Sequence, residues 1–572
     1  MRLRPAASLL FIALLLFAST ASLFALTDPV KIANGLISGI DGKDPAVRVY
    51  KGIPYAAPPA GDLRWKAPKA AANWDGVRKA DRFSAVCMQT PYPKNSLYYR
   101  EAEPASEDCL YLNIWTAAKS ASERRPVMVW IHGGALTRGS GSVPVYDGEA
   151  LAKKGVVVVT INYRLGIFGF FAHPELTKES DRNSSGNYAL LDQIAALEWV
   201  QNNIAAFGGN PKRVTIFGES AGSWSVNYLM ATPLARGLFQ RAIGESGGAF
   251  GPMKTLAEVE KTGVEFAHAM GAENVQALRA KSAEDVLKAS GASSFPPNVD
   301  GWMLPYDVYT IFATGKQNDV PILIGSNADE GKSLTMWPEN GKPDMFERQM
   351  RSRFHDKADQ ALKLYPAATD QQAKESFYAS FRDFVFGWQM RTWARLETKT
   401  GKSKAYLYYF TRVPPGPGAQ RYGAFHASEI AYVFDNLDSS PRPYEDADHK
   451  LADMMSSYWV NFATKGDPNG KGLPDWPAYR EKSDLALELG ADTHPVSDLH
   501  KAQLDFFDEY FDYEVRSRGE IPRMHTTVDL SGAWRRRGIC STIAGSHWVA
   551  APLVMCIRGH LTLFPYRDLN YS

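Results

Sequence analysis

Five short runs of nearly uninterrupted apolar residues are spread along the chain. They cover residues 127–131, 156–161, 214–217, 320–324 and 405–410, and each is rich in β-branched or aromatic side chains. A strand with one wet face alternates apolar and polar residues, whereas a strand covered on both faces of a parallel sheet is apolar throughout. We therefore expect these runs to be buried strands of a mostly parallel sheet.

Segments with helical spacing separate these runs. The clearest covers residues 188–207, where Leu190, Ile194 and Leu197 recur at intervals of three or four. The sequence GGNP at residues 208–211 ends it, because glycine and proline terminate helices. Alternating strands and helices predict an α/β fold with a large, central, mostly parallel sheet flanked by helices.

The first residues depart from this pattern. Arg2 and Arg4 precede an apolar run at residues 9–17, and small residues follow it. This order is typical of a secretory signal peptide, which we assign to residues 1–25. The alternative is an uncleaved anchor, since residues 5–27 contain no charge. Cleavage predicts a secreted or periplasmic protein without a stable membrane span.

The C-terminal residues 514–572 also lack a regular pattern. Three arginines at 535–537 precede an apolar stretch that His547 and Pro552 interrupt. We expect a poorly ordered tail outside the main domain, which we place at residues 26–513. A membrane span in the tail is the weaker interpretation, because polar residues and proline break the apolar stretch.

Composition narrows the classes of function. The 572 residues are 45% hydrophobic and 22% charged, as in ordinary globular proteins. With 64 basic and 62 acidic residues, the net charge of +2 argues against nucleic acid or an anionic membrane as the main partner. The four cysteines have no zinc spacing with histidines, so we expect no metal and no other cofactor. These features leave the oligomeric state open.

One segment has the spacing of a catalytic turn. GESAG at residues 218–222 follows the apolar run 214–217 and precedes a segment that reads as helix. G-x-S-x-G between a strand and a helix is the pattern of a nucleophile elbow, in which small neighbours give the turn clearance. The helix N-terminus behind the serine favours developing negative charge. We interpret Ser220 as the nucleophile; the alternative is a helix N-cap serine.

A second segment offers hydrogen-bond donors for an oxyanion. HGGA at residues 132–135 directly follows the apolar run 127–131. The hydrolase pattern combines the N–H after the nucleophile with N–H groups of such a loop. We therefore predict an oxyanion hole of Gly134, Ala135 and Ala221, and alanine at position 135 retains the N–H that is required. The alternative is a plain glycine loop.

Several further motifs match a known family. They are YKGIPYAAPP at residues 50–59, LRW at 63–65, EDCLYLN at 107–113, NYRLG at 162–166 and GGNP at 208–211. With the elbow, they show that the chain resembles the type B carboxylesterase family, the cholinesterase-like branch of the α/β-hydrolase fold. The resemblance runs from about residue 28 to residue 510, and the tail after it has no counterpart.

The resemblance implies the remaining members of a catalytic triad. The family's acid lies in a G-x-x-x-D-E-G motif, which here is GSNADEG at residues 325–331 and selects Glu330 over its neighbour Asp329. The family's histidine precedes E-x-x-Y-V-F, which selects His426. His132 precedes the oxyanion loop instead, and we expect it to hold that loop's backbone.

The resemblance also implies supporting features. Cys87 and Cys109 correspond to the family's N-terminal disulfide, which export would permit. Arg164 and Glu219 are expected to be charged groups that support the elbow. Whether Cys540 and Cys556 pair is left open.

We therefore expect a serine carboxylic-ester hydrolase that works through an acyl-enzyme on a small-molecule ester with a short-to-medium acyl or aryl group. Leu136, Trp224 and Phe250 are the candidates for the substrate pocket. No clear acidic cluster marks a choline-ester specialist. The alternatives are a catalytically inactive adhesion or binding module on the same fold, which the complete triad opposes, and a lipase-like interfacial esterase, which would need a mobile apolar lid.

Overall fold

The computed structural model describes residues 28–291 and 293–517. The predicted signal peptide, residues 1–25, lies outside the described residues, as does the predicted tail from residue 518 onward. The described residues form two compact units. One comprises residues 28–334 and 385–499, and the other comprises residues 335–384 and 500–517.

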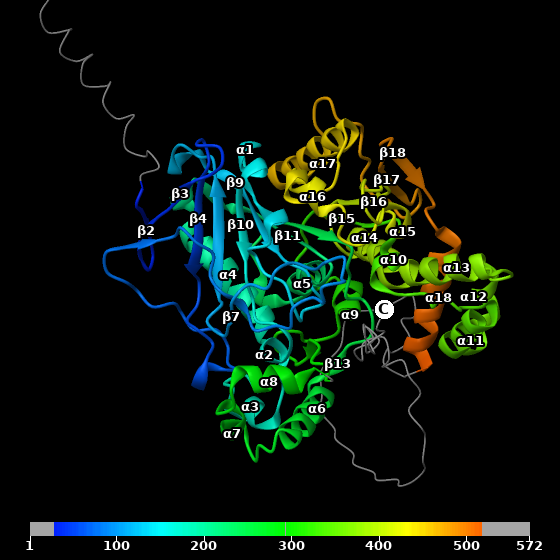
Figure 1. The fold of residues 1–572 in the computed structure, drawn as a ribbon, viewed down its shortest axis with the longest axis horizontal. Coiled ribbons are helices and arrows are strands. Elements are labelled where there is room, and N and C mark those ends of the chain that lie inside the picture. The colour runs from blue at the N-terminus through cyan, green and yellow to red at the C-terminus, as the bar shows by residue number, and fades with distance from the viewer. Residues whose placement is uncertain (1–27, 292, 518–572) are drawn as a thin grey trace, which may run out of the picture. The chain divides into compact units, whose positions relative to one another are not determined.

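The first unit is built on an eleven-stranded sheet (Figure 1). In spatial order its strands are β18 (His494–Ser497), β17 (Leu485–Leu489), β16 (Ala405–Phe410), β15 (Ile322–Asn327), β12 (Arg241–Glu245), β11 (Gly209–Glu219), β9 (Arg125–Ile131), β10 (Val157–Ile161), β8 (Tyr111–Thr116), β4 (Arg48–Pro54) and β3 (Ile40–Asp41). All neighbouring pairs from β17 to β10 are parallel, whereas the pairs at the two edges are antiparallel. The predicted α/β class and mostly parallel sheet are confirmed.

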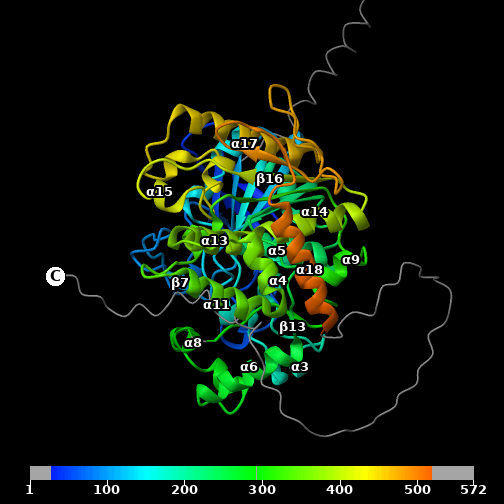
Figure 2. The same cartoon turned by 90° about the vertical axis from the view of Figure 1, so that its right-hand side faces the viewer.

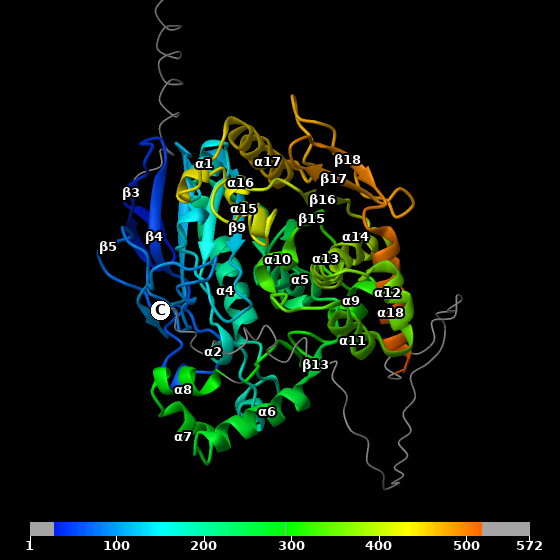
Figure 3. The same cartoon turned by 45° about the vertical axis from the view of Figure 1, so that its right-hand side comes forward.

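The five predicted strands all lie in this sheet. The run 405–410 coincides with β16, and the runs 127–131 and 214–217 lie within β9 and β11. The run 320–324 begins too early, since β15 starts at Ile322. Proline at position 321 has no N–H to donate to a neighbouring strand, which accounts for the later start. Figure 3 shows the strands in order from β3 at one edge to β18 at the other.

Helices cover both faces of the sheet. The helices of this unit are α1 (Glu149–Lys153), α2 (Gly166–Phe170), α3 (Pro174–Glu179), α4 (Tyr188–Asn203), α5 (Ala221–Ala231), α6 (Leu256–Ala269), α7 (Val275–Arg279), α8 (Ala283–Ser290), α9 (Val308–Ala313), α10 (Glu330–Leu334), α14 (Trp388–Thr400), α15 (Ala419–Tyr422), α16 (Ile430–Val433) and α17 (Asp446–Lys465), of which α6, α7 and α8 lie away from the strands of the sheet. Figure 2 shows α17 on one side of the strands and α4 and α5 on the other.

Strand β9 shows why the strands are apolar throughout. Met128 and Trp130 pack in one core cluster with residues of α1, α16 and α17. The Trp130 ring lies 4.8 Å from that of Phe217 and 5.0 Å from that of Phe434. Val129, which points to the opposite face, is also fully buried. Both faces of β9 therefore require apolar side chains.

The predicted helix at residues 188–207 is confirmed as α4 followed by a 3₁₀ turn, Ile204–Phe207. Gly208 ends this turn with φ = 79°, a left-handed conformation that favours glycine. The terminating GGNP motif thus lies at the predicted end of the helical segment and leads directly into β11, which begins at Gly209.

The second unit consists of α11 (Pro343–Phe354), α12 (Ala358–Leu364), α13 (Asp370–Arg382) and α18 (Lys501–Ser517). Aromatic rings join its segments: Phe354 lies 5.2 Å from Phe506 and 5.1 Å from Tyr510. Helix α18 continues to Ser517, beyond Tyr513, where the sequence pattern placed the end of the domain.

The described helices differ from membrane spans. The longest, α17, has 20 residues and carries Asp446, Lys450 and Asp453. Between residues 28 and 517, apart from position 292, no helix is both long and apolar enough to cross a bilayer.

Candidate active site

Ser220 lies at a strained corner between β11 and α5. Its backbone has φ = 57° and ψ = −121°, outside the regions that L-residues favour. Its N–H donates to Glu245 O at 2.8 Å, and its carbonyl accepts the Trp224 N–H at 2.9 Å. These bonds hold the corner from both sides, while Ser220 itself remains partly exposed to solvent.

The two glycines of the G-x-S-x-G pattern have a steric cause. A Cβ on Gly218 would lie 2.5 Å from Ile131 O, and a Cβ on Gly222 would lie 2.0 Å from the same atom. Both distances are shorter than real Cβ contacts. The end of β9 therefore passes too close to the elbow for any side chain at positions 218 and 222.

The predicted oxyanion loop lies beside the serine. A Cβ on Gly133 would lie 3.2 Å from Ser220 Cβ, so the two backbones are adjacent. Gly134 and Ala135 have φ of 112° and 56°, and the chain turns sharply there. Neither of their N–H groups is hydrogen-bonded to another group within the described residues, and Ala221 N–H belongs to the first residue of α5. Two of the predicted donors thus lie in the loop that passes the serine, and the third belongs to the residue that follows it.

His132 holds the oxyanion loop, as expected. Its Nδ1 lies 2.8 Å from Gly133 O, its ring stacks on Tyr163 at 4.4 Å, and its carbonyl accepts the Tyr163 hydroxyl at 2.6 Å. Burial lowers the pKa of His132 to about 3, so the ring is neutral. A neutral ring that donates from Nδ1 to Gly133 O supports the backbone of the loop.

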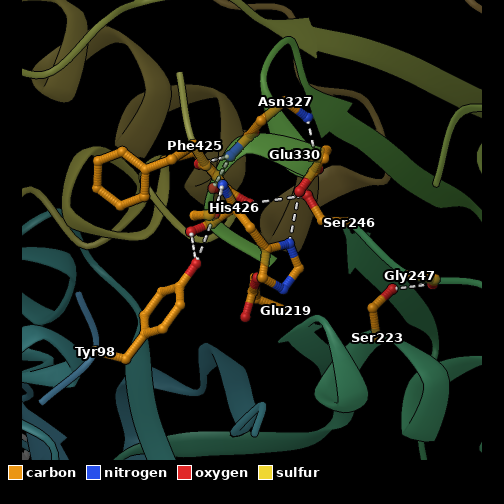
Figure 4. Close-up of polar contacts among 11 residues, drawn as sticks. Tyr98, Glu219, Ser223, Ser246, Gly247, Asn327, Glu330, Phe425 and His426 are labelled. Atoms are coloured by element: carbon orange, nitrogen blue, oxygen red, sulfur yellow. Dashed lines mark hydrogen bonds and ion pairs between the residues drawn. The ribbon is translucent and has the colours of Figure 1, made fainter. Parts of the chain in front are cut away.

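Glu330 and His426 meet, although 96 positions separate them in the chain (Figure 4). Glu330 begins α10, just after β15, and is fully buried; one oxygen accepts the Asn327 N–H at 2.8 Å. The other oxygen lies 2.6 Å from His426 Nδ1. A short bond from Nδ1–H to a buried carboxylate fixes both the tautomer and the orientation of the imidazole.

The other ring nitrogen of His426 faces Glu219. Nε2 lies 3.0 Å from Glu219 Oε1, at ion-pair distance but without the alignment of a hydrogen bond. Among the described residues, no hydrogen bond joins His426 to the hydroxyl of Ser220. Glu219 is more than a support of the elbow, because its carboxylate directly contacts the imidazole.

The charges of this group are interdependent. Burial opposes a charge on His426, but the carboxylates of Glu219 and Glu330 raise its pKa to about 9. Burial raises the pKa of Glu219 well above its ordinary value, with His426 opposing the shift and Glu429 and Glu330 adding to it. The charge states of Glu219 and His426 therefore depend on each other.

Two further buried carboxyl groups interact electrostatically with Glu219 and were not predicted. Glu429 accepts the Asn327 amide at 2.5 Å and the Ser246 hydroxyl at 3.4 Å; burial and then Glu330 raise its pKa to about 7. Glu245 accepts the Trp459 indole N–H at 2.8 Å, and burial raises its pKa well above the ordinary value. Glu429 lies in the motif that selected His426, so its position was a signal for this group.

The three pocket candidates lie in different surroundings. Leu136 ends the oxyanion loop with φ = 58° and is nearly buried, and Trp224 lies one turn after Ser220 on α5, partly exposed. Phe250 packs 5.3 Å from Phe312 in an aromatic group and is 3% exposed. The ring of Phe386 lies 5.0 Å from that of His426.

Cys87 and Cys109 form the predicted disulfide. It closes a loop with a sequence separation of 22 residues. Within residues 28–291 and 293–517, no group of three or more His, Cys, Asp or Glu residues is arranged to hold a metal ion. Arg164, the other predicted support, forms a buried ion pair with Asp192 at 2.6 Å.

Comparisons with known proteins agree with this arrangement. A sequence model of the Carboxylesterase family matches residues 27–507. Fumonisin B1 esterase of Sphingopyxis macrogoltabida is 39% identical over 494 residues, covering 82% of this chain and 89% of that protein. Para-nitrobenzyl esterase of Bacillus subtilis (strain 168) is 38% identical over 467 residues, covering 78% of this chain and 92% of that protein.

Solved structures give the same result. A PNB esterase structure matches with a TM-score of 0.72 and 34% identity, covering 83% of this chain and 99% of that chain. A thermophilic PNB esterase matches with a TM-score of 0.73 and 34% identity, covering 83% and 99%. The predicted α/β-hydrolase fold is thereby confirmed.

Proposed function

The chain belongs to the carboxylesterase family and is a carboxylic ester hydrolase, and on that premise we propose that it works through a Ser220–His426–Glu330 triad and an acyl-enzyme. The proposal extends to esters with short-to-medium acyl or aryl groups. The observation that carries it is the 2.6 Å contact between His426 Nδ1 and Glu330, next to a strained serine corner.

The first half of the reaction forms the acyl-enzyme. Ser220 Oγ attacks the ester carbonyl carbon, His426 Nε2 takes the hydroxyl proton, and the carbonyl π electrons move to the oxygen. The tetrahedral intermediate collapses, the C–O bond to the alcohol breaks, and His426 returns the proton to the leaving alkoxide. Glu330 keeps the Nδ1–H tautomer and stabilises the imidazolium between these steps.

Glu219 contacts the nitrogen of His426 that acts as the base in this mechanism. Its carboxylate lies 3.0 Å from Nε2, the atom that must accept the Ser220 proton. The contact lacks hydrogen-bond alignment, so Glu219 does not hold Nε2 in a hydrogen bond. Catalytic hydrogen bonds are often loose before substrate binds and tighten in the Michaelis complex. We infer that Nε2 engages Ser220 Oγ at that stage.

The N–H groups of Gly134, Ala135 and Ala221 stabilise the oxyanion. Gly134 and Ala135 belong to the loop beside the elbow, and the three N–H groups have no acceptor in the described residues, so no hydrogen bond must break when the charge develops. Preorganised donors of this kind are worth about 3–4 kcal/mol each in transition-state stabilisation. Water then repeats the attack on the acyl-enzyme and releases the acid.

The proposed substrate class is inferred from the positions of the predicted pocket residues and from the substrates for which relatives are named. Trp224, one turn beyond Ser220, and Leu136, in the oxyanion loop, are the predicted side chains nearest to the reacting atoms along the chain. One relative is named for para-nitrobenzyl esters, which supports aryl esters as the first compounds to assay. Phe250 remains a predicted lining residue, although its ring belongs to a packed aromatic group.

Export is part of the proposal. The Cys87–Cys109 disulfide is compatible with an oxidising compartment, where such bonds form and persist. With cleavage of residues 1–25, the enzyme is secreted or periplasmic, and residues 26–513 carry the catalytic domain.

The test is Ser220→Ala, assayed on p-nitrophenyl acetate and with a phosphonate ester that labels active serines. We expect hydrolysis to fall by several orders of magnitude, because the nucleophile is lost. The label should be absent from the variant and located on Ser220 of the parent by peptide mass spectrometry. Thermal unfolding should change little. Retained turnover, or a label on another serine, would contradict the assignment.

A further inference from the structure

In the loop closed by the Cys87–Cys109 disulfide, the side chain of Tyr98 contacts the candidate base, His426. The Tyr98 hydroxyl oxygen lies 3.1 Å from His426 O and 2.9 Å from Ser333 Oγ. Ser333 Oγ in turn lies 3.3 Å from His426 N. Figure 4 shows the Tyr98 hydroxyl pointing at the backbone of His426, while Glu330 faces the imidazole.

Three contacts join these groups. The His426 N–H donates to Ser333 Oγ, and the His426 carbonyl can only accept. The Tyr98 hydroxyl is the donor toward both the His426 carbonyl and Ser333 Oγ, so these two acceptors share its single proton. The three contacts close a ring around the main chain of His426.

Tyr98 remains a donor over the working range of pH. Burial raises its pKa well above the ordinary value, the Ser333 hydrogen bond opposes the shift, and Glu219 and Glu330 add to it. A neutral phenol keeps its proton, and so the bond to His426 O persists.

The ring also connects the acid and the base. Ser333 lies three residues after Glu330 on α10, on the same side of the helix. The segment around His426 has no regular secondary structure, and Ala427 adopts φ = 70°. Such a segment depends on contacts from elsewhere to hold its shape. Asn327 supplies one such contact, because its side-chain amide donates to Phe425 O at 2.9 Å. Tyr98 and Ser333 supply the contacts to the next residue, His426.

The loop that bears Tyr98 is itself held in place. It lies between the short strands β6 (Val86–Cys87) and β7 (Ala105–Ser106), inside the disulfide. Ser96 Oγ accepts the Tyr98 N–H at 3.1 Å, and the Tyr92 ring packs 5.9 Å from the Tyr98 ring. Arg138, which follows the oxyanion loop, lies 4.7 Å above the Tyr92 ring.

We propose that Tyr98 and Ser333 are positioning residues, which hold the main chain of His426 so that its imidazole keeps its contact with Glu330 and can engage Ser220 during the proposed reaction. The inference rests on the proposed function, because it assumes that His426 is the catalytic base. It makes the disulfide-closed loop a part of the catalytic apparatus, although no residue of that loop reacts.

The test compares Tyr98→Phe and Ser333→Ala in the full-length enzyme with the matched control Tyr99→Phe. Tyr99 is the adjacent residue, and its hydroxyl donates to Glu101 at 3.1 Å in an exposed hydrogen bond. Because small misplacements of a catalytic group are costly, we expect Tyr98→Phe and Ser333→Ala to lower kcat on p-nitrophenyl acetate about tenfold. KM should stay within about twofold, since the acyl pocket is untouched.

Three further readouts distinguish positioning from a merely structural role. The double variant Tyr98→Phe/Ser333→Ala should lose no more than the worse single variant, because both break one ring. Ser333→Thr, which keeps the hydroxyl, should restore most of kcat. The acid limb of the kcat/KM–pH profile should move to lower pH. A less firmly held imidazole interacts more weakly with the Glu330 carboxylate, so the pKa of His426 falls.

The outcomes separate this inference from the proposed function. If His426→Ala retains turnover, the triad assignment fails and this inference with it. If His426→Ala is inactive but Tyr98→Phe and Ser333→Ala keep the parent kcat and pH profile, only the positioning role is overturned. If the Tyr98→Phe variant does not fold, the comparison of Ser333→Ala with Ser333→Thr tests the positioning role alone. Equal kcat values for these two variants would overturn that role.

Discussion

At the scale of single residues, the most informative position is Glu219. It precedes Ser220 in the chain, and its carboxylate lies 3.0 Å from the nitrogen of His426 that takes the serine proton in the proposed mechanism. Two carboxylates, Glu219 and Glu330, thus flank one imidazole from opposite nitrogens. Both favour its charged form, whereas a general base must be neutral to act.

Glu219→Gln should therefore make the enzyme active at lower pH. In the parent, kcat/KM should rise as His426 loses its proton, around its pKa of about 9. Removing one of the negative charges that raise this pKa lowers it, so the acid limb of the pH–rate profile moves to lower pH. The measurement is kcat/KM for p-nitrophenyl acetate from about pH 5 to pH 10.

The matched control is Glu265→Gln, an exposed carboxylate on α6. It should leave the acid limb in place. An unchanged limb in Glu219→Gln, with normal turnover, would mean that Glu219 does not set the charge of His426.

At the scale of elements, the strand ends explain why the predicted residues meet. Ser220 follows β11, the oxyanion loop follows β9, and Glu330 follows β15, and these strands are parallel. Their carboxyl ends lie along one edge of the sheet, where ligands bind in open α/β sheets. The apolar runs thus predicted the strands after which these three parts of the candidate site lie.

Other elements left weaker signals in the sequence. Strand β18 is short, with the exposed residues His494 and Pro495, and the edge strand β3 has only two residues. Neither makes an apolar run, because an edge strand does not need both faces buried. The segment that bears His426 has no periodicity at all, so only the family resemblance located it.

The disulfide-closed loop is the element whose role can be tested apart from any single hydroxyl. Replacing both Cys87 and Cys109 with serine should lower the free energy of unfolding by roughly 3 kcal/mol in the chain-entropy model. Because Tyr98 lies in this loop, kcat should fall as well, with KM little changed. Guanidinium unfolding and steady-state kinetics are the measurements.

The loss of kcat should not exceed that of Tyr98→Phe, since both changes act through the same contact. A double serine variant that is less stable but fully active would separate the disulfide from the positioning of His426.

At the scale of the whole molecule, the sequence predicted the fold class and the family but not the division into two units. Residues 335–384 associate with residues 500–517 across more than a hundred intervening positions. Periodicity reports which face of a helix is buried and not which distant helix covers it. The burial of the carboxyl groups Glu245 and Glu429 was not predicted for a related reason. Only the folded chain assembles their surroundings, which come from several strands and helices.

The end of the catalytic domain provides the last prediction. The family match stops at residue 507, but α18 continues to Ser517, and Phe506 and Tyr510 pack against Phe354 within the second unit. A chain of residues 26–517 should therefore fold and keep kcat/KM within about twofold of the parent, because every described contact is retained.

A shorter chain that ends at Leu499 is the matched control. It removes α18, exposing the ring of Phe354 and the apolar faces of α11 and α12, and should lose several kcal/mol of stability or fail to fold. Thermal unfolding and p-nitrophenyl acetate hydrolysis of both chains are the measurements. If the chain of residues 26–517 is insoluble or inactive, residues 518–572 belong to the catalytic domain, and the boundary inferred from the sequence pattern is wrong.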